Sequence, residues 1–243
     1  MIDPATDQAK QAARGRVWSL LHEAGVALPP GAHGRIPNFT GADEAAYRLS
    51  QLDEWRDAQV IKANPDWAQH PVRVAALNAG KLLYMAVPKL ATAQPFYLLD
   101  PASIAEPFEV VATGDGAAQH ASRIDVAQMR PVDLIIAGSV AVNRHGVRVG
   151  KGAGYSDIEV ALLTEAGLIG PDTVIITTVH PLQIVDGDLP ETEHDFSVDL
   201  IITPDEVIRC APPRRPNGIM ATHLTPEKVR AIPALTRFAG DVR

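Results

Sequence analysis

The stretch Gly150-Lys-Gly-Ala-Gly-Tyr-Ser-Asp157 decides how the rest of the chain is interpreted. Its alternating glycines tolerate positive φ and let a ligand approach the backbone closely. Backbone N–H groups in such a loop, ahead of a helix N-terminus, form an anion site, and Arg148 and Lys151 add the positive charge that a polyphosphate attracts. Asp157 offers a hard carboxylate that can hold Mg²⁺ against the phosphate. Taken alone, the motif is equally typical of a flexible turn between a hairpin and a helix.

The flanking segments place this loop between a strand and a helix. Residues 133–137 are short and apolar, as expected of a buried strand, and residues 140–149 are typical of a hairpin. After the glycines, Ser156 and Glu159 fit a capping box with Ser156 as the N-cap, and apolar residues continue at helical spacing up to Gly167. A phosphate-binding site is expected at such a junction.

Strand and helix patterns alternate along the chain. Helices are predicted over residues 6–24, 42–55, 72–79 and 226–232, and further strands over 58–63, 82–87, 96–99, 173–179, 200–202 and 207–210. Residues 112–119 are small and polar and are expected to form a surface loop. This β-α-β alternation predicts an α/β protein with a mainly parallel sheet covered on both faces. Ligands of such sheets bind at the carboxyl ends of the strands.

Length and composition favour one main domain, residues 1–211. The 243 residues are 46% hydrophobic, enough for a sizeable core, and the net charge of −7 gives no reason to expect nucleic acid as a partner. No apolar run approaches the about 20 residues of a membrane span and no basic-plus-apolar leader is present, so we expect a cytoplasmic protein without a membrane partner. Residues 212–243 differ in composition and are expected to form a tail with one short helix. The tail can dock on the body or on the second subunit of a homodimer.

Three segments together resemble the 5-formyltetrahydrofolate cyclo-ligase family, also called methenyltetrahydrofolate synthetases. They are Lys10-x-x-x-Arg14, Arg148-x-Gly-x-Gly-x-Gly-Tyr-x-Asp157, and Leu189-Pro-x-x-x-His-Asp195 with the strand that follows it. Their order and spacing agree over roughly residues 10–210. The resemblance implies a three-layer α/β/α fold of the kind shared with ribose-5-phosphate isomerase and CoA-transferase domains. It also implies an ATP- and Mg²⁺-dependent ligase of folate and one-carbon metabolism.

The resemblance further assigns an ATP site. Lys10 and Arg14, four residues apart on one helix face, reach the phosphates, although an isolated pair of this kind is more often a solvated basic face. Arg148 and Lys151 are the candidate catalytic residues, because they neutralise charge on the transferred phosphoryl group. The remaining nucleotide-binding residues are Gly150, Gly152, Ala153, Gly154, Tyr155 and Ser156.

Two carboxylates, Asp157 and Asp195, match the pair that lies beside Mg²⁺ in this family. Each has a structural alternative. Asp157 can simply favour the positive end of the helix dipole, and Asp195 can cap a turn.

The sequence departs from the family on the substrate side. Ordinary cyclo-ligases carry a Glu that recognises the folate ring, whereas residues 64–73 contain no Glu and only Asp66 as a carboxylate. Because this segment follows a strand and begins a helix, we expect it to form the substrate wall. Asn64, Trp67 and Arg73 are the candidate substrate-binding residues, with Arg73 facing an anionic group.

Three functional hypotheses remain open at this point. The first is an ATP-dependent cyclo-ligase acting on 5-formyltetrahydrofolate. The second is a paralogue with another small-molecule substrate, from a divergent branch linked to thiamin metabolism. The third is a non-catalytic regulator that binds a nucleotide or a folate. The missing Glu favours the second hypothesis over the first, and the intact cationic and acidic residues favour catalysis over the third.

Overall fold

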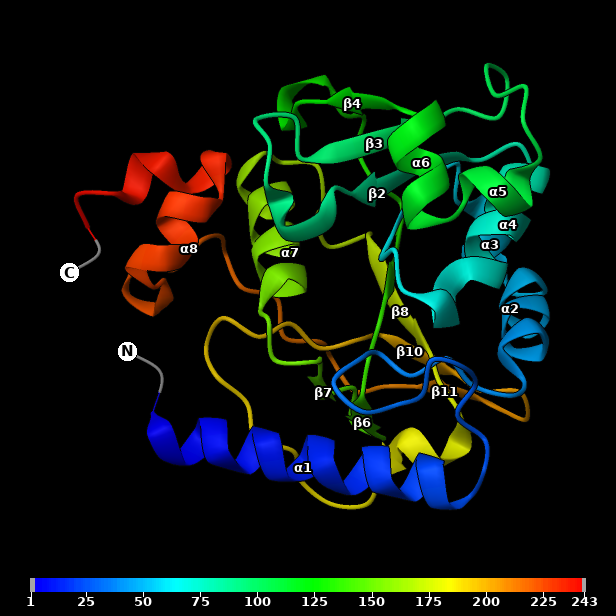
Figure 1. Ribbon diagram of the computed structural model, residues 1–243, viewed down its shortest axis with the longest axis vertical. Coiled ribbons are helices and arrows are strands. Elements are labelled where there is room, and N and C mark those ends of the chain that lie inside the picture. Colours follow the sequence, from blue (N-terminus) through cyan, green and yellow to red (C-terminus); the bar gives the residue numbers. More distant parts are fainter. Residues whose placement is uncertain (1–2, 242–243) are drawn as a thin grey trace.

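The apolar strands of the sequence form a mixed eight-stranded sheet with the order β11-β10-β8-β5-β1-β2-β3-β4. The computed structural model describes residues 3–241 (Figure 1). The strands are β1 (Val60–Ala63), β2 (Leu82–Ala86), β3 (Phe96–Leu99), β4 (Ser122–Ile124), β5 (Leu134–Ala137), β8 (Val174–Thr178), β10 (Leu200–Ile202) and β11 (Val207–Arg209). Neighbours from β10 to β2 are parallel, whereas β11, β3 and β4 pair antiparallel at the edges. The predicted mainly parallel sheet is confirmed.

A small second sheet carries the predicted hairpin. Strand β6 (Ala141–Asn143) pairs antiparallel with β7 (Arg148–Val149) and parallel with β9 (Ile184–Val185). The hairpin follows β5 and leads directly into the glycine loop (residues 150–154). The loop is therefore held at both ends by regular structure.

Helices cover both faces of the main sheet. They are α1 (Pro4–Glu23), α2 (Ala42–Ser50), α3 (Asp53–Asp57), α4 (His70–Asn78), α5 (Phe108–Val111), α6 (Gly114–His120), α7 (Tyr155–Glu165) and α8 (Pro226–Ala231). None of the helices within residues 3–241 combines the length and the apolar character needed to cross a bilayer.

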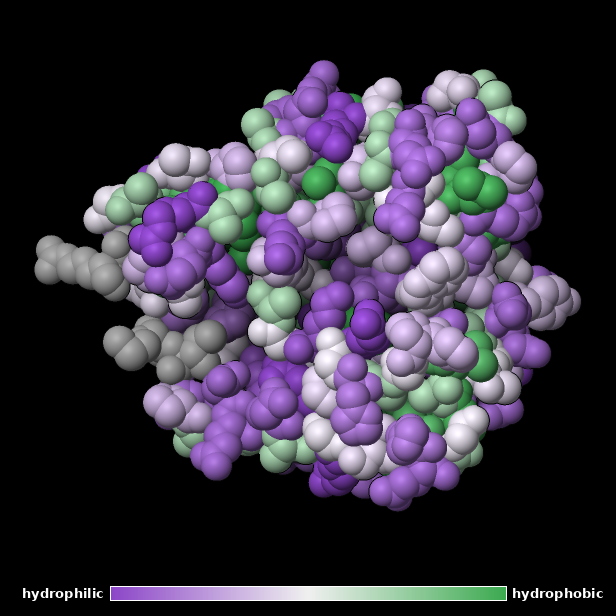
Figure 2. Space-filling model, viewed as in Figure 1, coloured by the Kyte–Doolittle hydropathy of each residue, from purple (hydrophilic) through white to green (hydrophobic). Residues whose placement is uncertain are grey.

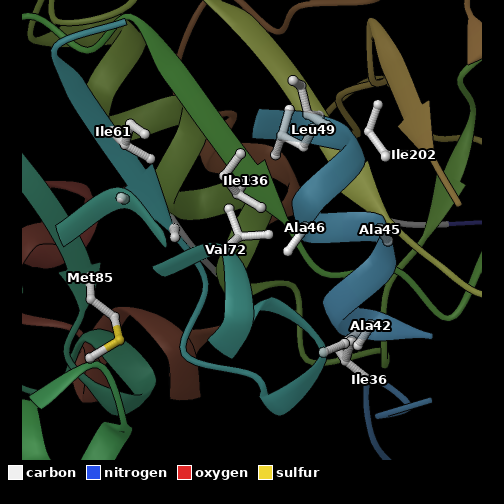
Figure 3. Close-up of a cluster of buried hydrophobic side chains, with 14 of the residues drawn as sticks. Ile36, Ala42, Ala45, Ala46, Leu49, Ile61, Val72, Met85, Ile136 and Ile202 are labelled. Atoms are coloured by element: carbon white, nitrogen blue, oxygen red, sulfur yellow. The ribbon is translucent and has the colours of Figure 1, made fainter. Parts of the chain in front are cut away.

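Alternation along the strands produces the three layers. Successive side chains of a strand point to opposite faces, so Leu134 and Ile136 of β5 pack with α2 and α4, whereas Ile135 and Ala137 pack with α7. Figure 3 shows the first of these clusters, with side chains from α2 and α4 directed at the sheet. The three-layer α/β/α architecture predicted from the resemblance is confirmed.

Two local predictions are wrong. The helix predicted over residues 42–55 is split into α2 and α3, because Leu52 adopts an extended conformation that turns Trp55 into the core. The loop predicted over residues 112–119 contains α6. The hydroxyl of Thr113 caps this helix by accepting a hydrogen bond from the amide of Gly116 at 2.9 Å. A Cβ on Gly116 would lie 1.9 Å from the carbonyl oxygen of Val110, so this glycine serves close packing and not flexibility.

The C-terminal segment packs on the body of its own chain. Val229, Ile232 and Leu235 are buried in the same cluster as the inner face of α7. Glu165, at the end of α7, pairs with Arg237 and accepts a hydrogen bond from the amide of Ile219 at 3.0 Å. In Figure 1, α8 accordingly lies beside α7. The domain boundary at residue 211 stays a prediction.

The strand order creates a switch point beside β1. From β1 the chain first adds β2 on one side and later adds β5 on the other. The segments that follow β1 and β5 therefore diverge at the carboxyl edge of the sheet, which opens a crevice for a ligand. Asn64, directly after β1, is fixed there because its backbone N–H donates a hydrogen bond to the carbonyl of Ile136 at 3.0 Å.

The helix-sheet interface predicts a large cost for truncating Leu49. This side chain of α2 is fully buried (0% exposed), and removal of its buried methyl groups leaves a cavity. We expect Leu49→Ala to lower the free energy of unfolding by about 2–5 kcal/mol. Urea denaturation measures this, with Leu20→Ala as the control, because Leu20 of α1 is 41% exposed. Equal midpoints for the two variants would contradict this packing.

Candidate active site

A cavity of about 430 Å³ opens at the carboxyl ends of β1 and β2, beside the glycine loop. Three segments supply most of its wall: the residues after β1, those after β2, and the glycine loop with the start of α7. Side chains from α1 and α8 close two further sides. Figure 2 shows hydrophilic surface where α1, α7 and α8 come together. The lining residues are Asp7, Arg14, Ile36, Asn64, Pro65, Asp66, Ala86, Val87, Pro88, Lys89, Arg148, Gly150, Lys151, Gly152, Ala153, Gly154, Tyr155, Ser156, Asp157, Glu159, His194, Asp195 and Lys228.

The glycine loop uses the backbone freedom of its glycines at two positions. Gly152 (φ 98°) and Gly154 (φ 69°) are left-handed, a conformation that other residues rarely adopt. A Cβ on Gly152 would lie 3.2 Å from Cζ of Arg14. The loop is thus shaped so that a guanidinium from α1 can approach its backbone.

The predicted capping box at the start of α7 is wrong. Gly154 is the N-cap and α7 begins at Tyr155, two residues earlier than a Ser156 cap would allow. The hydroxyl of Ser156 instead accepts a hydrogen bond from Nδ2 of Asn64 at 2.8 Å. Glu159 is consequently free to point inward, where it pairs with Lys62 of β1.

Three predicted cations converge on the loop. Nε of Arg14 donates to the carbonyl of Gly150 at 2.7 Å. Arg148 pairs with Asp157 (Nη1 to Oδ1, 3.2 Å), and its guanidinium lies 4.4 Å from the centroid of the Phe196 ring. Nε of Arg148 is buried and has no hydrogen-bond partner within residues 3–241. The third cation, Lys151, is half-exposed and pairs with Asp66.

Lys10 reaches the cavity through Asp195. Its buried ammonium pairs with the Asp195 carboxylate, which also accepts a hydrogen bond from the amide of Thr192 at 2.6 Å. Burial opposes ionisation of Asp195, but the charge and hydrogen bonds of Lys10 and those of Thr192 outweigh it, so the pKa of Asp195 is lowered. Burial raises the pKa of Asp157, although Arg148 opposes that rise. The two carboxylates thus lie near each other in different electrostatic states.

Residues 64–73, the predicted substrate wall, are arranged differently from that prediction. Asn64 and Asp66 line the cavity, and Oδ1 of Asp66 lies 3.1 Å from Nζ of Lys151. Trp67 is 53% exposed and packs against the His70 ring outside the cavity wall. Its predicted contact with the substrate is therefore not supported.

Arg73 points away from the cavity, contrary to the prediction that it faces an anionic group. It lies on the inner face of α4, is 1% exposed, and donates to backbone carbonyls of the loop after β1 and of the segment before α6. Burial lowers the pKa of this guanidinium, and Asp66 opposes the shift. Arg73 therefore braces the loop after β1 from within the core.

Comparison with known proteins identifies the family. The sequence pattern of the 5-formyltetrahydrofolate cyclo-ligase family matches residues 6–204. The chain belongs to this family.

Two relatives of the chain are methenyltetrahydrofolate synthase domain-containing proteins. The mouse protein (Mus musculus) is 36% identical over 234 residues, covering 93% of this chain and 62% of the relative. The cattle protein (Bos taurus) is 34% identical over 241 residues, covering 96% and 63%. The chain thus spans about three-fifths of the length of these relatives. The solved structure of Aquifex aeolicus 5,10-methenyltetrahydrofolate synthetase covers 85% of this chain and 93% of its own, with a TM-score of 0.52 and 17% identity, a likeness of fold.

Several residues in or near this cavity were not found from the sequence. Lys62 and Glu159 are separated by 97 residues, so local spacing gives no signal of their pairing. Lys89 (φ 60°) and Leu90 (φ 52°) form a left-handed turn without glycine, and the buried Leu90 side chain packs where this turn meets the core. Lys228 reaches the cavity from α8, beyond the family match.

The Lys62–Glu159 pair predicts a strong dependence of stability on both partners. Their side chains are 1% and 5% exposed, and removal of one leaves a buried charge unpaired. We expect Lys62→Met to lower the free energy of unfolding by about 3–5 kcal/mol, and Lys62→Met/Glu159→Leu to recover most of that loss.

Guanidinium denaturation at pH 7 measures both variants. The control is Arg56→Met, which removes an ion pair whose partners are 67% and 76% exposed and should leave the midpoint unchanged. A double variant as unstable as Lys62→Met would show that the loss arises from packing and not from an unpaired charge.

Proposed function

We propose that this member of the cyclo-ligase family is an ATP- and Mg²⁺-dependent enzyme that activates a formyl- or amide-type oxygen of a small molecule, 5-formyltetrahydrofolate or a related compound, for cyclisation. The observation that carries the proposal is the convergence of Arg14, Arg148 and Lys151 on a glycine loop at the carboxyl edge of a parallel sheet. Family membership supports the reaction class, and the residues of the cavity support the nucleotide.

The cavity suits a polyphosphate. The left-handed Gly152 and Gly154 let the cationic side chains of Arg14 and Lys228 lie against the loop backbone, and the N-terminus of α7 adds a positive dipole end. The buried Nε of Arg148 has no hydrogen-bond acceptor in the part of the chain that the structure describes, and is a donor in need of one. Phosphate oxygens would satisfy that donor, whereas an apolar ligand would not.

The acidic residues suit Mg²⁺ only in the company of a phosphate. Within residues 3–241, no three His, Cys, Asp or Glu side chains are placed to hold a metal together. Mg²⁺ prefers six oxygen ligands and is commonly held by one or two carboxylates, substrate phosphates and water. Asp157 and Asp195 would supply the carboxylates in this proposal.

The chemistry requires positioning and charge stabilisation and no nucleophilic side chain. In the proposed reaction the formyl oxygen attacks the γ-phosphorus of ATP and ADP leaves. The neighbouring N–H nitrogen then attacks the activated carbon, phosphate leaves with the former formyl oxygen, and the nitrogen releases its proton to phosphate or water. Arg148 and Lys151 would neutralise charge on the transferred group, and Arg14 would hold the phosphates in line. Burial of Arg148 in a cavity strengthens this electrostatic role.

The substrate side favours a second candidate, a cyclo-ligase-like enzyme with an altered substrate. Asp66, the one carboxylate of residues 64–73, is already paired with Lys151. Arg73 is engaged by backbone carbonyls and cannot bind a substrate anion without breaking them. Within residues 64–73, the wall therefore offers no free carboxylate or guanidinium to recognise a pterin ring. A related compound with a different ring is the better match to this cavity.

The nucleotide site predicts that Gly152→Val weakens Mg·ATP binding by at least tenfold. Valine is strained at a φ of 98°, and its side chain presses against Arg14 and into the path of a phosphate. Isothermal calorimetry measures the affinity. Gly80→Val is the matched control, because Gly80 has a φ of 73° and open space around its Cβ position, far from the cavity wall. Equal affinity in wild type and Gly152→Val would sink the proposed nucleotide site.

The substrate wall predicts weak turnover of 5-formyltetrahydrofolate. A site without a carboxylate to accept the hydrogen bond of a buried pterin donor loses discrimination for that substrate of the order of 10⁴-fold. Asp66 can supply the carboxylate only by breaking its ion pair with Lys151. Formation of methenyltetrahydrofolate, followed by absorbance, measures the rate. Turnover equal to that of ordinary cyclo-ligases, abolished by Asp66→Asn, would show instead that Asp66 replaces the missing Glu.

A further inference from the structure

The C-terminal helix brings a cation to the glycine loop from outside the family match. Lys228 of α8 lies in the cavity wall, whereas the match ends at residue 204. A Cβ on Gly154 would lie 2.6 Å from Nζ of Lys228, so the ammonium rests directly against the loop backbone. This position is next to the N-terminus of α7, on the same loop that Arg14 contacts through Gly150.

The ammonium of Lys228 has unused donors. Its side chain is half-buried and makes no hydrogen bond or ion pair in the described part of the chain, residues 3–241. Asp157 is the acidic residue that acts on it electrostatically, and burial lowers the pKa of the lysine against that influence. Three N–H donors held in a half-buried position at a cavity wall would gain from an anionic acceptor.

The segment that carries Lys228 is firmly attached. The hydroxyl of Thr225 caps the N-terminus of α8. Val229 within the helix and Ile232 directly after it are buried against α7. Arg237 pairs with Glu165 at the far end of α7. The backbone that carries the lysine is therefore fixed before any ligand binds, which lowers the entropic cost of using its ammonium.

We propose that Lys228 is a further anion-binding residue of this cavity and that the C-terminal segment is part of the nucleotide site. The inference rests on the proposed function, since the anion it would bind is the polyphosphate of the nucleotide. Cations from three separate elements, Arg14 of α1, Arg148 of β7 and Lys228 of α8, then surround one polyphosphate.

Replacement of Lys228 by glutamine tests this. Calorimetry with Mg·ATP and, separately, with inorganic tripolyphosphate should show affinity about tenfold weaker in Lys228→Gln, because a charge-assisted contact is lost. Lys228→Arg should retain most of the affinity. The affinity of wild type should also fall more steeply with added salt than that of Lys228→Gln. Arg230→Gln is the matched control, since Arg230 lies on the same helix, is exposed and pairs with the similarly exposed Glu227.

The outcomes are separable. If Lys228→Gln binds both ligands as wild type does while Gly152→Val weakens them, the proposed function stands and the role of Lys228 is overturned. If wild type binds neither ligand, the proposed function fails and this inference fails with it. If Lys228→Gln lowers the melting temperature of the free protein but leaves affinity unchanged, Lys228 only balances the charge of Asp157, which also overturns the inference.

Discussion

The buried ion pair between Lys62 and Glu159 ties the central strand β1 to the helix that follows the glycine loop. Taking two charges out of water costs several kcal/mol each, and only close contact between them offsets that cost. The pair is therefore intolerant of any shift between β1 and α7. A second contact, the hydrogen bond from Asn64 to Ser156, joins the end of β1 to the first turn of α7, closer to the cavity. Together these contacts set where α7 begins and where the loop lies over the sheet edge.

The cavity owes its electrostatic character to carboxylates that hold the cations in place. Asp195 orients Lys10, Asp157 orients Arg148, and Asp66 orients Lys151. Such pairing keeps long side chains ordered before a ligand arrives, so little reorganisation is needed when charge develops. Within residues 3–241, Nε of Arg148 has no hydrogen-bond partner, and the ammonium of Lys228 makes no hydrogen bond or ion pair. These are the donors that a polyphosphate would engage.

The two sides of the cavity differ in how closely they follow the cyclo-ligase family. The loop side keeps its glycines, its arginine and its aspartate in the expected positions. On the opposite side, Arg73 binds the backbone of the segment after β1 from within the core, and Asn64, Pro65 and Asp66 of that segment line the cavity. The buried guanidinium thus fixes the loop after β1 through three hydrogen bonds to backbone carbonyls.

Local sequence determined the parts of this protein that depend on neighbours along the chain. The hairpin, the left-handed glycines, the apolar strands and the parallel sheet follow from side-chain periodicity and from the backbone freedom of glycine, which act over a few residues. Only the tertiary structure decided that Arg73 turns inward, that Glu159 meets Lys62 and that Lys228 reaches the loop. Each of these depends on which surface of a helix packs against which strand. That choice is set by the burial of apolar side chains far apart in the sequence, and no spacing rule within one segment contains it.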